Sequence, residues 1–443
     1  MSAEPTPQPY SRRRSLSSAV WATAQQLVAV GSTAVSGILL ARVVPVADFG
    51  VFSYATSMAS IGTTILTVGL AGLAIKALVD DPARSGRTMT ALSLIREVFA
   101  AVAFAALLSV SLSAGSATVT VATALALTVL FARAVDATEI WFQSRADSGK
   151  TAPIRISVVV VMLACRVLMA LAGASLADFL ILYVIEAFVT SALLLVRYLT
   201  FKGSPGYARP DARTPRDLLK KSWVLALSGV AGQVNSRGDV IVIQALLSST
   251  AVGIYSAAAR LSEMLYFLPA VFMTATFPRL LQIRKKHGHA SVEYRRELQS
   301  SYDRACWAGI AIAIVLYFVG PPLLVLLYGA EYAASGAILQ VHVLALPFVF
   351  MAAVFSKWII AENLLLASLL RHGLGAALNI ALNLALIPAM GILGSAVATA
   401  VSYLLASYLS CFLTKSTRSA GVMMTLALLF PIRLVRQGLR RSR

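Results

Sequence analysis

The stretch PIRISVVVVMLACRVLMALAG, residues 153–173, is almost continuously apolar and carries only two charges, Arg155 and Arg166. A helix needs about 20 predominantly apolar residues to cross the hydrocarbon core of a bilayer. A strand of a membrane barrel needs about 10 residues in strict alternation, and this stretch does not alternate. It therefore predicts a transmembrane helix.

The rest of the 443-residue chain has the same character. Its residues are 58% hydrophobic and 13% charged, whereas a soluble domain averages roughly 25% charged residues. The composition excludes a soluble globular domain, and its hydrophobicity excludes a disordered chain. We predict an all-α membrane protein with twelve transmembrane helices, at about residues 17–41, 49–75, 88–112, 116–142, 153–173, 176–198, 220–247, 250–279, 299–327, 334–358, 364–388 and 391–413.

Basic residues are concentrated on one side of these predicted spans. The chain has 38 Lys and Arg against 19 Asp and Glu, which gives a formal net charge of +19. A nucleic-acid-binding protein would gather such an excess on a soluble face, but here most of it falls in the two tails and in every second link between spans. By the positive-inside rule these segments are cytoplasmic, and so are both termini.

A weak internal repeat predicts two halves of six spans each. FGVFSYA at 49–55 opens the second span, and VGIYSAA at 252–258 opens the eighth. Because six is even, the two halves run in the same direction, as in many transporters with a site between their lobes. We expect a cytoplasmic tail at 1–16, an N-lobe at 17–198, a cytoplasmic linker at 199–219, a C-lobe at 220–413 and a basic cytoplasmic tail at 414–443 that contains an interfacial helix, with a central cavity between the lobes.

Seven arginines fall outside the basic tails and links: Arg42, Arg96, Arg133, Arg166, Arg237, Arg260 and Arg304. A charge at the bilayer centre costs at least about 2.5–3.5 kcal/mol, so those within the spans are expected to face the protein interior or a wet cavity. Acidic residues of the spans are their candidate partners, for pairing or for coupling: Asp136, Glu139, Glu186, Asp239 and Glu263.

Spacing indicates which of these charges pair. Asp136 follows Arg133 by three residues, and Glu263 follows Arg260 by three residues, so each pair shares a helix face. Such pairs can simply hold helices together, or they can line a ligand site, and the spacing does not decide between the two.

Two further polar groups lie inside predicted spans of the second half. Arg237 and Asp239 flank Gly238, and two residues on one regular helix at this spacing cannot face each other, so we expect a distorted or unwound segment that lines a cavity. Asn379 and Asn383 are four residues apart and share a face. They serve either to hydrogen-bond neighbouring helices or to contact a sugar.

Motifs for common chemistries are missing from the sequence. It has no Gly-rich phosphate loop with a Lys-Ser/Thr pair and no Gly-x-Ser-x-Gly elbow. Its three cysteines show no metal or disulfide spacing. We therefore expect no enzymatic activity, no cofactor and no metal site.

The stretch LLKKSWVLALSGVAGQVNSRGDVIVIQALLSSTAVGIYSAAARLSEMLYFLPAVFMTATFPRL, residues 218–280, resembles the oligosaccharide flippase family. These are the Wzx-type exporters of the multidrug/oligosaccharidyl-lipid/polysaccharide superfamily. LLARVVPVADFGVFSYA at 39–55, LLYGAEYAASGAILQ at 326–340 and LNIALNLALIPAMGILGSAVATAVSY at 378–403 also match its pattern. The resemblance covers essentially all twelve predicted spans.

The resemblance implies a flippase of the bacterial inner (plasma) membrane that moves a polyprenyl-diphosphate-linked oligosaccharide to the outer leaflet by alternating access. Its partners would be that lipid, the membrane lipids, and the polymerase and glycosyltransferases of the same polysaccharide pathway, with no nucleic acid. Arg42, Arg237 and Arg260 are the foremost candidates for the diphosphate. Asp239 and Glu263 would tune these arginines or couple transport to a proton or cation. The full set of candidate substrate contacts is Arg42, Arg237, Arg260, Arg133, Arg166, Asn379 and Asn383.

Two alternatives stay open. One is a cation-coupled exporter of small amphiphiles, although drug-exporting relatives typically carry an acidic residue in the first span and this chain has none there. The other is a membrane-embedded glycosyl-transferring enzyme or polymerase, which the short outer loops disfavour because they leave little chain to build a catalytic site.

Overall fold

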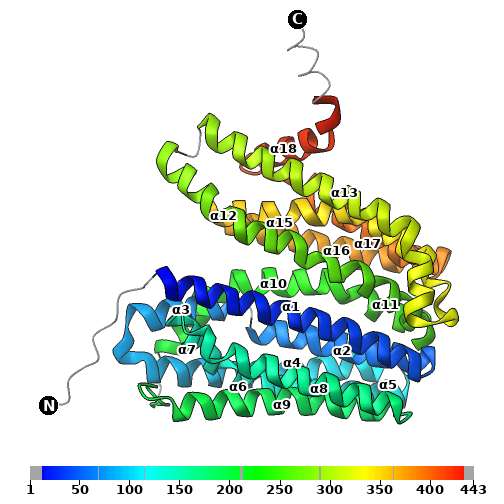
Figure 1. Cartoon of the computed structure of the whole chain (residues 1–443), viewed down its shortest axis with the longest axis horizontal. Helices are drawn as coiled ribbons and strands as arrows, with labels where there is room; N and C mark the ends of the chain where they lie inside the picture. Colours follow the sequence, from blue (N-terminus) through cyan, green and yellow to red (C-terminus); the bar gives the residue numbers. More distant parts are fainter. Residues whose placement is uncertain are drawn as a thin grey trace, which may run out of the picture. The chain divides into compact units, whose positions relative to one another are not determined.

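In the computed structural model, the residues described are 12–67, 69–113, 115–209, 213–288, 291–362 and 364–433. Their regular secondary structure is helical throughout (Figure 1). Of the predicted tails and linker, residues 1–11, 210–212 and 434–443 lie outside the described residues. Eleven segments of the described chain are long and apolar enough to cross a membrane.

The predicted seventh span, 220–247, is the one that does not meet these two criteria of length and apolarity. It lies in α10 (Arg213–Leu246), a helix of 34 residues that is long enough to cross a bilayer. Its second half carries a polar run from Gln233 to Asp239. The count of twelve spans therefore stays a prediction.

The chain divides into two compact units. Unit 1 takes Met1–Val43, as far as it is described, and Met58–Ala226, whereas unit 2 takes Val44–Ser57 and Leu227–Arg443. The helices wholly in unit 1 are α1 (Arg12–Val43), α3 (Leu70–Asp80), α4 (Ser85–Ser113), α5 (Ala117–Leu127), α6 (Val129–Val135), α7 (Ala137–Ser144), α8 (Ala152–Leu171) and α9 (Leu176–Thr200). The helices wholly in unit 2 are α11 (Ser249–Glu263), α12 (Phe267–His287), α13 (Val292–Tyr328), α14 (Ser335–His342), α15 (Leu346–Ala361), α16 (Leu365–Met390), α17 (Ile392–Ser407) and α18 (Arg418–Leu428). Both α2 (Val46–Thr67) and α10 contribute to each unit.

Two predicted spans of unit 1 are broken in the structure. The predicted span 49–75 is divided between α2 and α3 next to Gly69, whose φ of 77° lies in the left-handed region that favours glycine. A Cβ on Gly69 would also lie 2.7 Å from the carbonyl oxygen of Ser222, so the chain approaches closely there. The fourth span is divided into α5, α6 and α7 at Thr128 and Asp136.

The links that carry the basic residues of unit 1 lie together. The start of α1 reaches the α7–α8 link through a hydrogen bond from Ser18 Oγ to Ser148 Oγ (2.8 Å). The backbone of Ala208, in the link after α9, donates to the carbonyl of Gly86 at the start of α4 (3.3 Å). This gathering at one end of the unit is the arrangement that the positive-inside rule requires of links on one membrane side.

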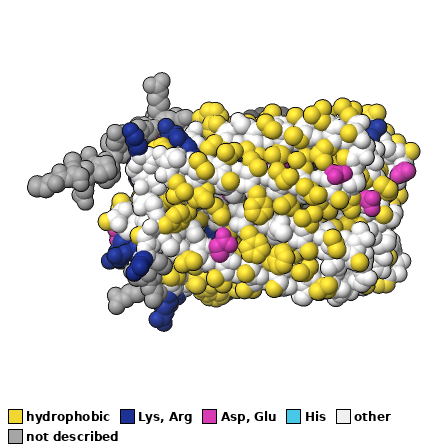
Figure 2. All heavy atoms as spheres, turned by 90° about the horizontal axis from the view of Figure 1, so that it is seen from below, with side chains coloured by type: hydrophobic (Ala, Val, Ile, Leu, Met, Phe, Trp, Pro, Cys, Tyr) yellow, Lys and Arg dark blue, Asp and Glu magenta, His cyan; other side chains and the backbone are white. Residues whose placement is uncertain are grey.

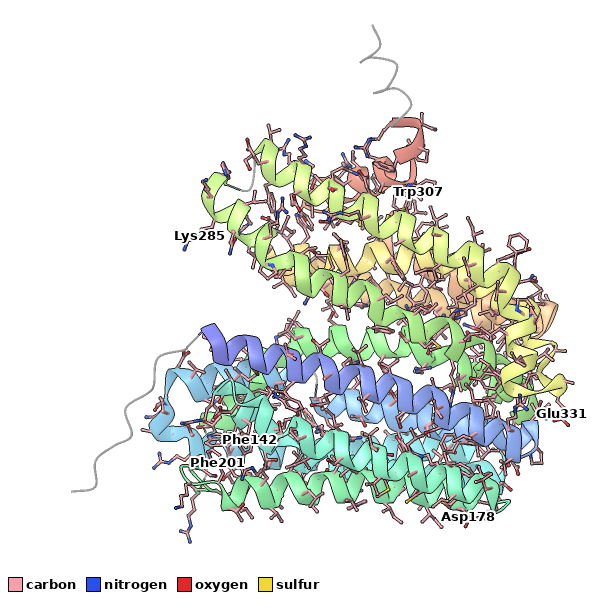
Figure 3. The ribbon with its side chains drawn as sticks, viewed as in Figure 1. Phe142, Asp178, Phe201, Lys285, Trp307 and Glu331 are labelled. Carbon is pink, nitrogen blue, oxygen red and sulfur yellow. The ribbon has the colours of Figure 1, made fainter. Side chains whose placement is uncertain are left out.

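An aromatic cluster at that end of unit 1 joins α7 to the end of α9. The rings of Trp141 and Phe142 meet edge to face, with centroids 4.9 Å apart, and Trp141 packs in the same way on Tyr198 (5.5 Å). Phe142 contacts Phe201 at 5.4 Å, and both are labelled in Figure 3. Edge-to-face pairs add about 0.5–1.5 kcal/mol each beyond the burial of area, so this cluster fixes the short α7 against α9.

In unit 2 the two halves of the predicted repeat meet. A Cβ on Gly253 of α11 would lie 2.3 Å from the carbonyl oxygen of Val46, and one on Gly50 of α2 would lie 1.7 Å from that of Ser249. The first turns of α2 and α11 therefore touch backbone to backbone, as small residues allow in membrane helices. The two equivalent glycines of the repeat form this contact.

The distortion that we predicted around Gly238 is absent from the described chain, because α10 runs as one helix through this position. The glycines there serve close approach instead. A Cβ on Gly238 would contact Asn379 and Ile380 of α16 at 3.6 and 3.8 Å, and one on Gly232 would meet the ring of His372 at 3.2 Å. The prediction of an unwound segment was wrong because glycine in a helix can mark close packing as well as a break.

The helix near the C-terminus packs on α13. α18 has 11 residues, about 17 Å of helix, which is too short to cross a bilayer. Trp307 Nε1 donates to the carbonyl of Ala427 (2.9 Å), and Gln299 Nε2 donates to that of Met423 (3.0 Å). Its place at the membrane interface stays a prediction.

The surface of the protein is largely apolar. In Figure 2 hydrophobic side chains are spread over much of the face in view, and most of its basic side chains lie toward one end. Helix α8, for example, exposes Val160, Val161, Leu168 and Leu171. Such a surface suits contact with lipid rather than water.

Candidate functional site

A cavity of about 450 Å³ lies within unit 1. Hydroxyl groups of α2 line one side of it, and charged groups of α4, α6, α7 and α8 line the other. The lining residues are Ser60, Thr63, Thr64, Thr67, Leu70, Ala71, Arg96, Arg133, Asp136, Glu139, Ile140, Gln143, Arg155 and Tyr183. A cavity of this size is typical of ligand sites, which span about 300–1,000 Å³.

The break at Asp136 brings the charged groups together. The amide of Asp136 bonds to the carbonyl of Arg133, and the amide of Glu139 bonds to that of Asp136. These three-residue turns join α6 to α7. The guanidinium of Arg133 then lies beside the carboxylate of Asp136, with Nη1 and Oδ2 3.1 Å apart.

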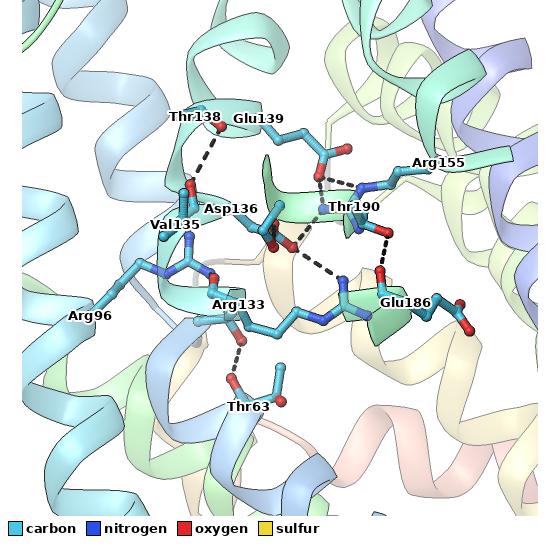
Figure 4. Close-up of polar contacts among 12 residues, drawn as sticks. Thr63, Arg96, Arg133, Val135, Asp136, Thr138, Glu139, Arg155, Glu186 and Thr190 are labelled. Atoms are coloured by element: carbon cyan, nitrogen blue, oxygen red, sulfur yellow. Dashed lines mark hydrogen bonds and ion pairs between the residues drawn. The ribbon is translucent and has the colours of Figure 1, made fainter. Parts of the chain in front are cut away.

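Arg155 of α8 connects both carboxylates (Figure 4). Its Nη2 lies 2.8 Å from Asp136 Oδ2 and 2.6 Å from Glu139 Oε2, and its Nε donates to Glu139 at 3.0 Å. Ser191 of α9 donates to the other oxygen of Asp136 (2.6 Å). Three helical segments thus converge on one buried carboxylate.

Arg96 of α4 supplies a third guanidinium to the cavity. Only 3% of its surface is exposed. Its Nη2 donates to the carbonyl of Arg133 (2.8 Å), and its Nε has no hydrogen-bond partner among the described residues. The cavity therefore holds three guanidinium groups and two carboxylates, with one buried donor unused.

The hydroxyls of α2 complete the lining. Thr63, Thr64 and Thr67 each donate to the carbonyl four residues earlier, at 2.8, 3.0 and 2.9 Å. Their donor capacity is used by the helix, so their oxygens remain as acceptors for the hydroxyl groups of a ligand.

Arg166 and Glu186 are brought together away from this lining. They form an ion pair between α8 and α9, and the side chain of Arg166 is buried. Arg42, by contrast, lies exposed in the last turn of α1.

In unit 2 the acidic residue Asp239 lies in a buried polar network. Its exposed fraction is 2%. The hydroxyl of Tyr255 donates to its Oδ2 and lies 3.2 Å from the hydroxyl of Thr399. Asn379 Nδ2 reaches Thr399 at 3.5 Å, and Asn383 Nδ2 donates to the side-chain oxygen of Asn379 at 3.1 Å. Both asparagines are fully buried. Asn379 links α16 to α17 through Thr399, whereas Asn383 bonds to Asn379 within α16, and neither lines the cavity of unit 1.

Glu263 has a different partner from the one that its spacing predicted. Its Oε2 lies 2.8 Å from Nη1 of Arg237 on α10. Arg260 points instead to α2, where Nη2 donates to Ser53 Oγ (3.2 Å) and the guanidinium lies 5.1 Å from the ring centroid of Phe49. Spacing along a helix shows which groups can meet, but a partner from another helix can compete for them.

Sequence reasoning did not name two of the three arginines in the unit 1 cavity, Arg96 and Arg155, as substrate contacts. We counted Arg155 with the basic cytoplasmic links, and we expected Arg96 to face the protein interior or a wet cavity without assigning it a contact with the substrate. Their signal was available, because each stands within a largely apolar stretch that forms a long helix.

Comparison with known proteins identifies the family. A family model described as polysaccharide biosynthesis protein matches residues 15–284. The chain belongs to this family. The resemblance to oligosaccharide flippases that the sequence indicated is thereby confirmed.

Two curated relatives illustrate the likeness. The chain is 23% identical over 222 residues to the probable low-salt glycan biosynthesis flippase Agl15 of Haloferax volcanii, a match that covers 48% of this chain and 46% of that protein. It is 24% identical over 344 residues to the EPS I polysaccharide export inner membrane protein EpsE of Ralstonia nicotianae, covering 75% of this chain and 78% of that protein. The matches to Agl15 and to a second Haloferax protein, the probable flippase AglR, each span less than half of the relative.

Solved structures establish the fold. The lipid II flippase MurJ in an inward closed conformation aligns with a TM-score of 0.73 and 14% identity over 95% of this chain and 93% of that one. A multidrug resistance MATE family transporter in an inward-facing conformation aligns with a TM-score of 0.64 and 12% identity over 93% and 96%. The protein is thus an all-helical, multi-pass membrane protein with a MurJ- and MATE-like fold.

Proposed function

We propose that the protein is a flippase that moves a polyprenyl-diphosphate-linked oligosaccharide from the cytoplasmic to the outer leaflet of the plasma membrane during cell-surface polysaccharide synthesis. It would work by alternating access of two six-helix lobes, with both termini in the cytoplasm. Family membership supports the substrate class, because the matched relatives bear the names of flippases and of a polysaccharide exporter.

The observation that carries the proposal is the arginine cavity of unit 1. A diphosphate is a dense anion, and guanidinium groups bind phosphate oxygens through paired, charge-assisted hydrogen bonds. Arg96 offers an unused Nε donor, and Arg133 is the most exposed member of the charged cluster. The threonines of α2 present oxygens that suit sugar hydroxyls.

The two carboxylates give the cavity a counter-charge. Asp136 and Glu139 neutralise Arg133 and Arg155 when no substrate is bound. We expect an entering diphosphate to replace Asp136 as the partner of Arg133, while Arg155 and Ser191 keep Asp136 in place. The exchange exposes no uncompensated charge, which would otherwise cost several kcal/mol per ion.

Two residues of unit 2 remain our candidates for coupling. Asp239 and Glu263 are acidic groups within helices, and each is held by a specific partner, Tyr255 and Arg237. Protonation or cation binding at either would change a local ion pair or hydrogen bond. We propose that this change drives the conformational cycle.

Export in cells tests the assignment of the cavity. In a strain that lacks the native gene, Arg133→Gln and Arg96→Gln should reduce polymer export by about tenfold or more, since each removes a charge-assisted contact worth about 1.5–3 kcal/mol. The lipid-linked intermediate should accumulate at the cytoplasmic face. Arg84→Gln is the matched control, because Arg84 is a basic residue of unit 1 whose side chain is 63% exposed. Normal export by both cavity variants at wild-type protein levels would remove the cavity from the mechanism.

The same assay tests the earlier candidates. Arg42→Ala and Arg237→Ala should also impair export if these residues contact the headgroup. Efflux of small amphiphiles by membrane vesicles without any lipid-linked sugar would favour the alternative of a cation-coupled exporter. Chemical conversion of a lipid-linked sugar by the purified protein would favour an enzyme.

A further inference from the structure

A second cavity lies in unit 2, between the first turns of α16 and the segment that follows α17. Its volume is about 180 Å³. Arg371 of α16 and Phe355 of α15 form one part of the wall, and Thr414 and Thr417, from the turn before α18, form another. The cavity is separate from the lining described for unit 1.

Arg371 is a buried cation that lacks an acidic partner. Its exposed fraction is 6%. Nη2 donates to Ser356 Oγ at 3.0 Å and to His372 Nε2 at 2.9 Å, and the guanidinium lies 5.3 Å from the ring centroid of Phe355. Its Nε has no hydrogen-bond partner, and no Asp or Glu pairs with it, in the part of the chain that the structure describes.

Two other arginines of the helices have the counter-charge that Arg371 lacks, although the buried Arg96 of α4 lacks one too among the described residues. Arg155 and Arg166 each pair with at least one carboxylate. Burying a charge without a counter-charge costs several kcal/mol, and the contacts of Arg371 with a hydroxyl, an imidazole and a ring offset only part of that. An anion in the cavity would supply the missing charge and accept the hydrogen of Nε.

The rim of the cavity indicates the kind of anion. Leu370 and Leu413 line the cavity and are also 55% and 74% exposed, so they mark its opening to the outside. Apolar side chains at the opening of a charged cavity suit a ligand with a charged head and a hydrocarbon tail. Arg371 stands six residues after the start of α16, about 9 Å along the helix, toward the end of this span that we predict to be cytoplasmic. Basic pockets between membrane helices on the cytoplasmic side bind lipid headgroups.

We infer that this cavity binds the phosphate group of an anionic membrane phospholipid through Arg371. The hydroxyl of Thr414 turns from Thr417 toward a remaining phosphate oxygen, whereas Thr417 keeps its hydrogen bond to the carbonyl of Cys411 (2.8 Å). The acyl chains run over Leu370 and Leu413. The site is distinct from the proposed transport cavity, so it holds whether or not the protein is a flippase. Its consequence is that an anionic phospholipid stabilises unit 2.

Thermal unfolding of the purified full-length protein in detergent tests this inference. Titration with phosphatidylglycerol should raise the midpoint of the wild type by several degrees. Arg371→Gln should need about tenfold more lipid for the same rise, because it loses hydrogen bonds to a charged group. Arg371→Lys keeps the charge but loses the planar set of donors, so the amount of lipid that it needs should lie between those of the wild type and Arg371→Gln. Thr414→Val removes one hydroxyl and should weaken binding less.

The controls separate this lipid from other sources of phosphate. Arg304→Gln changes an arginine of unit 2 whose side chain is 49% exposed and should respond to phosphatidylglycerol as the wild type does. Inorganic phosphate at the same concentration should have little effect, and a polyprenyl diphosphate should not displace the phospholipid.

Three results would overturn the inference. Equal responses of the wild type, Arg371→Gln and Arg371→Lys would show that Arg371 holds no lipid. Equal protection by inorganic phosphate would make the cavity a site for soluble anions. Displacement by a polyprenyl diphosphate at much lower concentration would assign the cavity to the transported lipid. If Arg371→Gln does not fold, Arg371→Lys and Thr414→Val carry the same comparison.

Discussion

At the scale of single residues, Arg155 organises the unit 1 cavity. It holds two carboxylates from α7 and from the junction before it, and it stands at the start of the apolar stretch that predicts the fifth span. The same side chain therefore serves folding and the electrostatics of the cavity. Its loss would leave Asp136 with Arg133 and leave Glu139 without its ion-pair partner.

Arg155→Gln should accordingly destabilise the protein. Breaking a buried ion pair by removing one partner costs about 3–5 kcal/mol, because the other charge stays buried. Chemical denaturation of the protein in mixed micelles measures the effect. Arg84→Gln should change the free energy of unfolding by less than about 0.5 kcal/mol, since it removes an exposed pair. Equal stability of Arg155→Gln and the wild type would refute this role.

Residue spacing anticipated part of these contacts. The three-residue interval predicted that Arg133 and Asp136 share a face, and they lie 3.1 Å apart. The same interval did not fix the partner of Glu263, which pairs with Arg237 from another helix. Local spacing reports only on one helix, whereas long-range partners depend on tertiary packing.

At the scale of helices, the contact of α2 with α11 leaves no room for a side chain between the two backbones. Gly50 and Gly253 occupy equivalent places in the repeat, and their missing side chains let the two backbones meet. The sequence showed this repeat and its glycines, but it did not show that they face each other. Similarly, it showed the length of α10 but not its continuity through Gly238.

Gly253→Ala should therefore weaken unit 2. Its Cβ would lie 2.3 Å from the carbonyl oxygen of Val46, so the helices must separate, and overpacking of this kind costs about 1–3 kcal/mol. Gly72→Ala is the matched control, because a Cβ there meets nothing within 4 Å. It should be neutral or stabilising by up to about 1 kcal/mol, as expected for alanine in a helix. Thermal unfolding of the two variants distinguishes these outcomes, and equal midpoints would contradict the account of the contact.

At the scale of the whole molecule, composition alone identified the class of protein. The apolar stretches predicted spans, eleven of which are matched by helices of sufficient length and apolarity. The motifs predicted the family, which the family model confirms. The predicted tail, lobe and linker ranges stay a prediction, and the compact units divide the chain differently, since Val44–Ser57 belongs to unit 2. A segment that packs with distant sequence cannot be assigned from composition.

The candidate site was less accessible to sequence reasoning. Intramembrane charges were recognised as functional candidates, and Arg133, Asp136 and Glu139 line the unit 1 cavity. Arg155 was assigned to a cytoplasmic link because it lies near the start of a span. The depth of a side chain within a helix bundle follows from tilt and packing, which the sequence does not specify.

Transport by the reconstituted protein tests the central claim most directly. Proteoliposomes would contain a fluorescent polyprenyl-diphosphate oligosaccharide, and a membrane-impermeant quencher would report how much of it changes leaflet. We expect the wild type and Arg84→Gln to flip the lipid at similar rates, and Arg133→Gln to be slower by about tenfold or more. An Arg133→Gln protein that flips the lipid as fast as the wild type would contradict the assignment of the cavity to the diphosphate. Absence of flipping by the folded wild-type protein would contradict the proposed function itself.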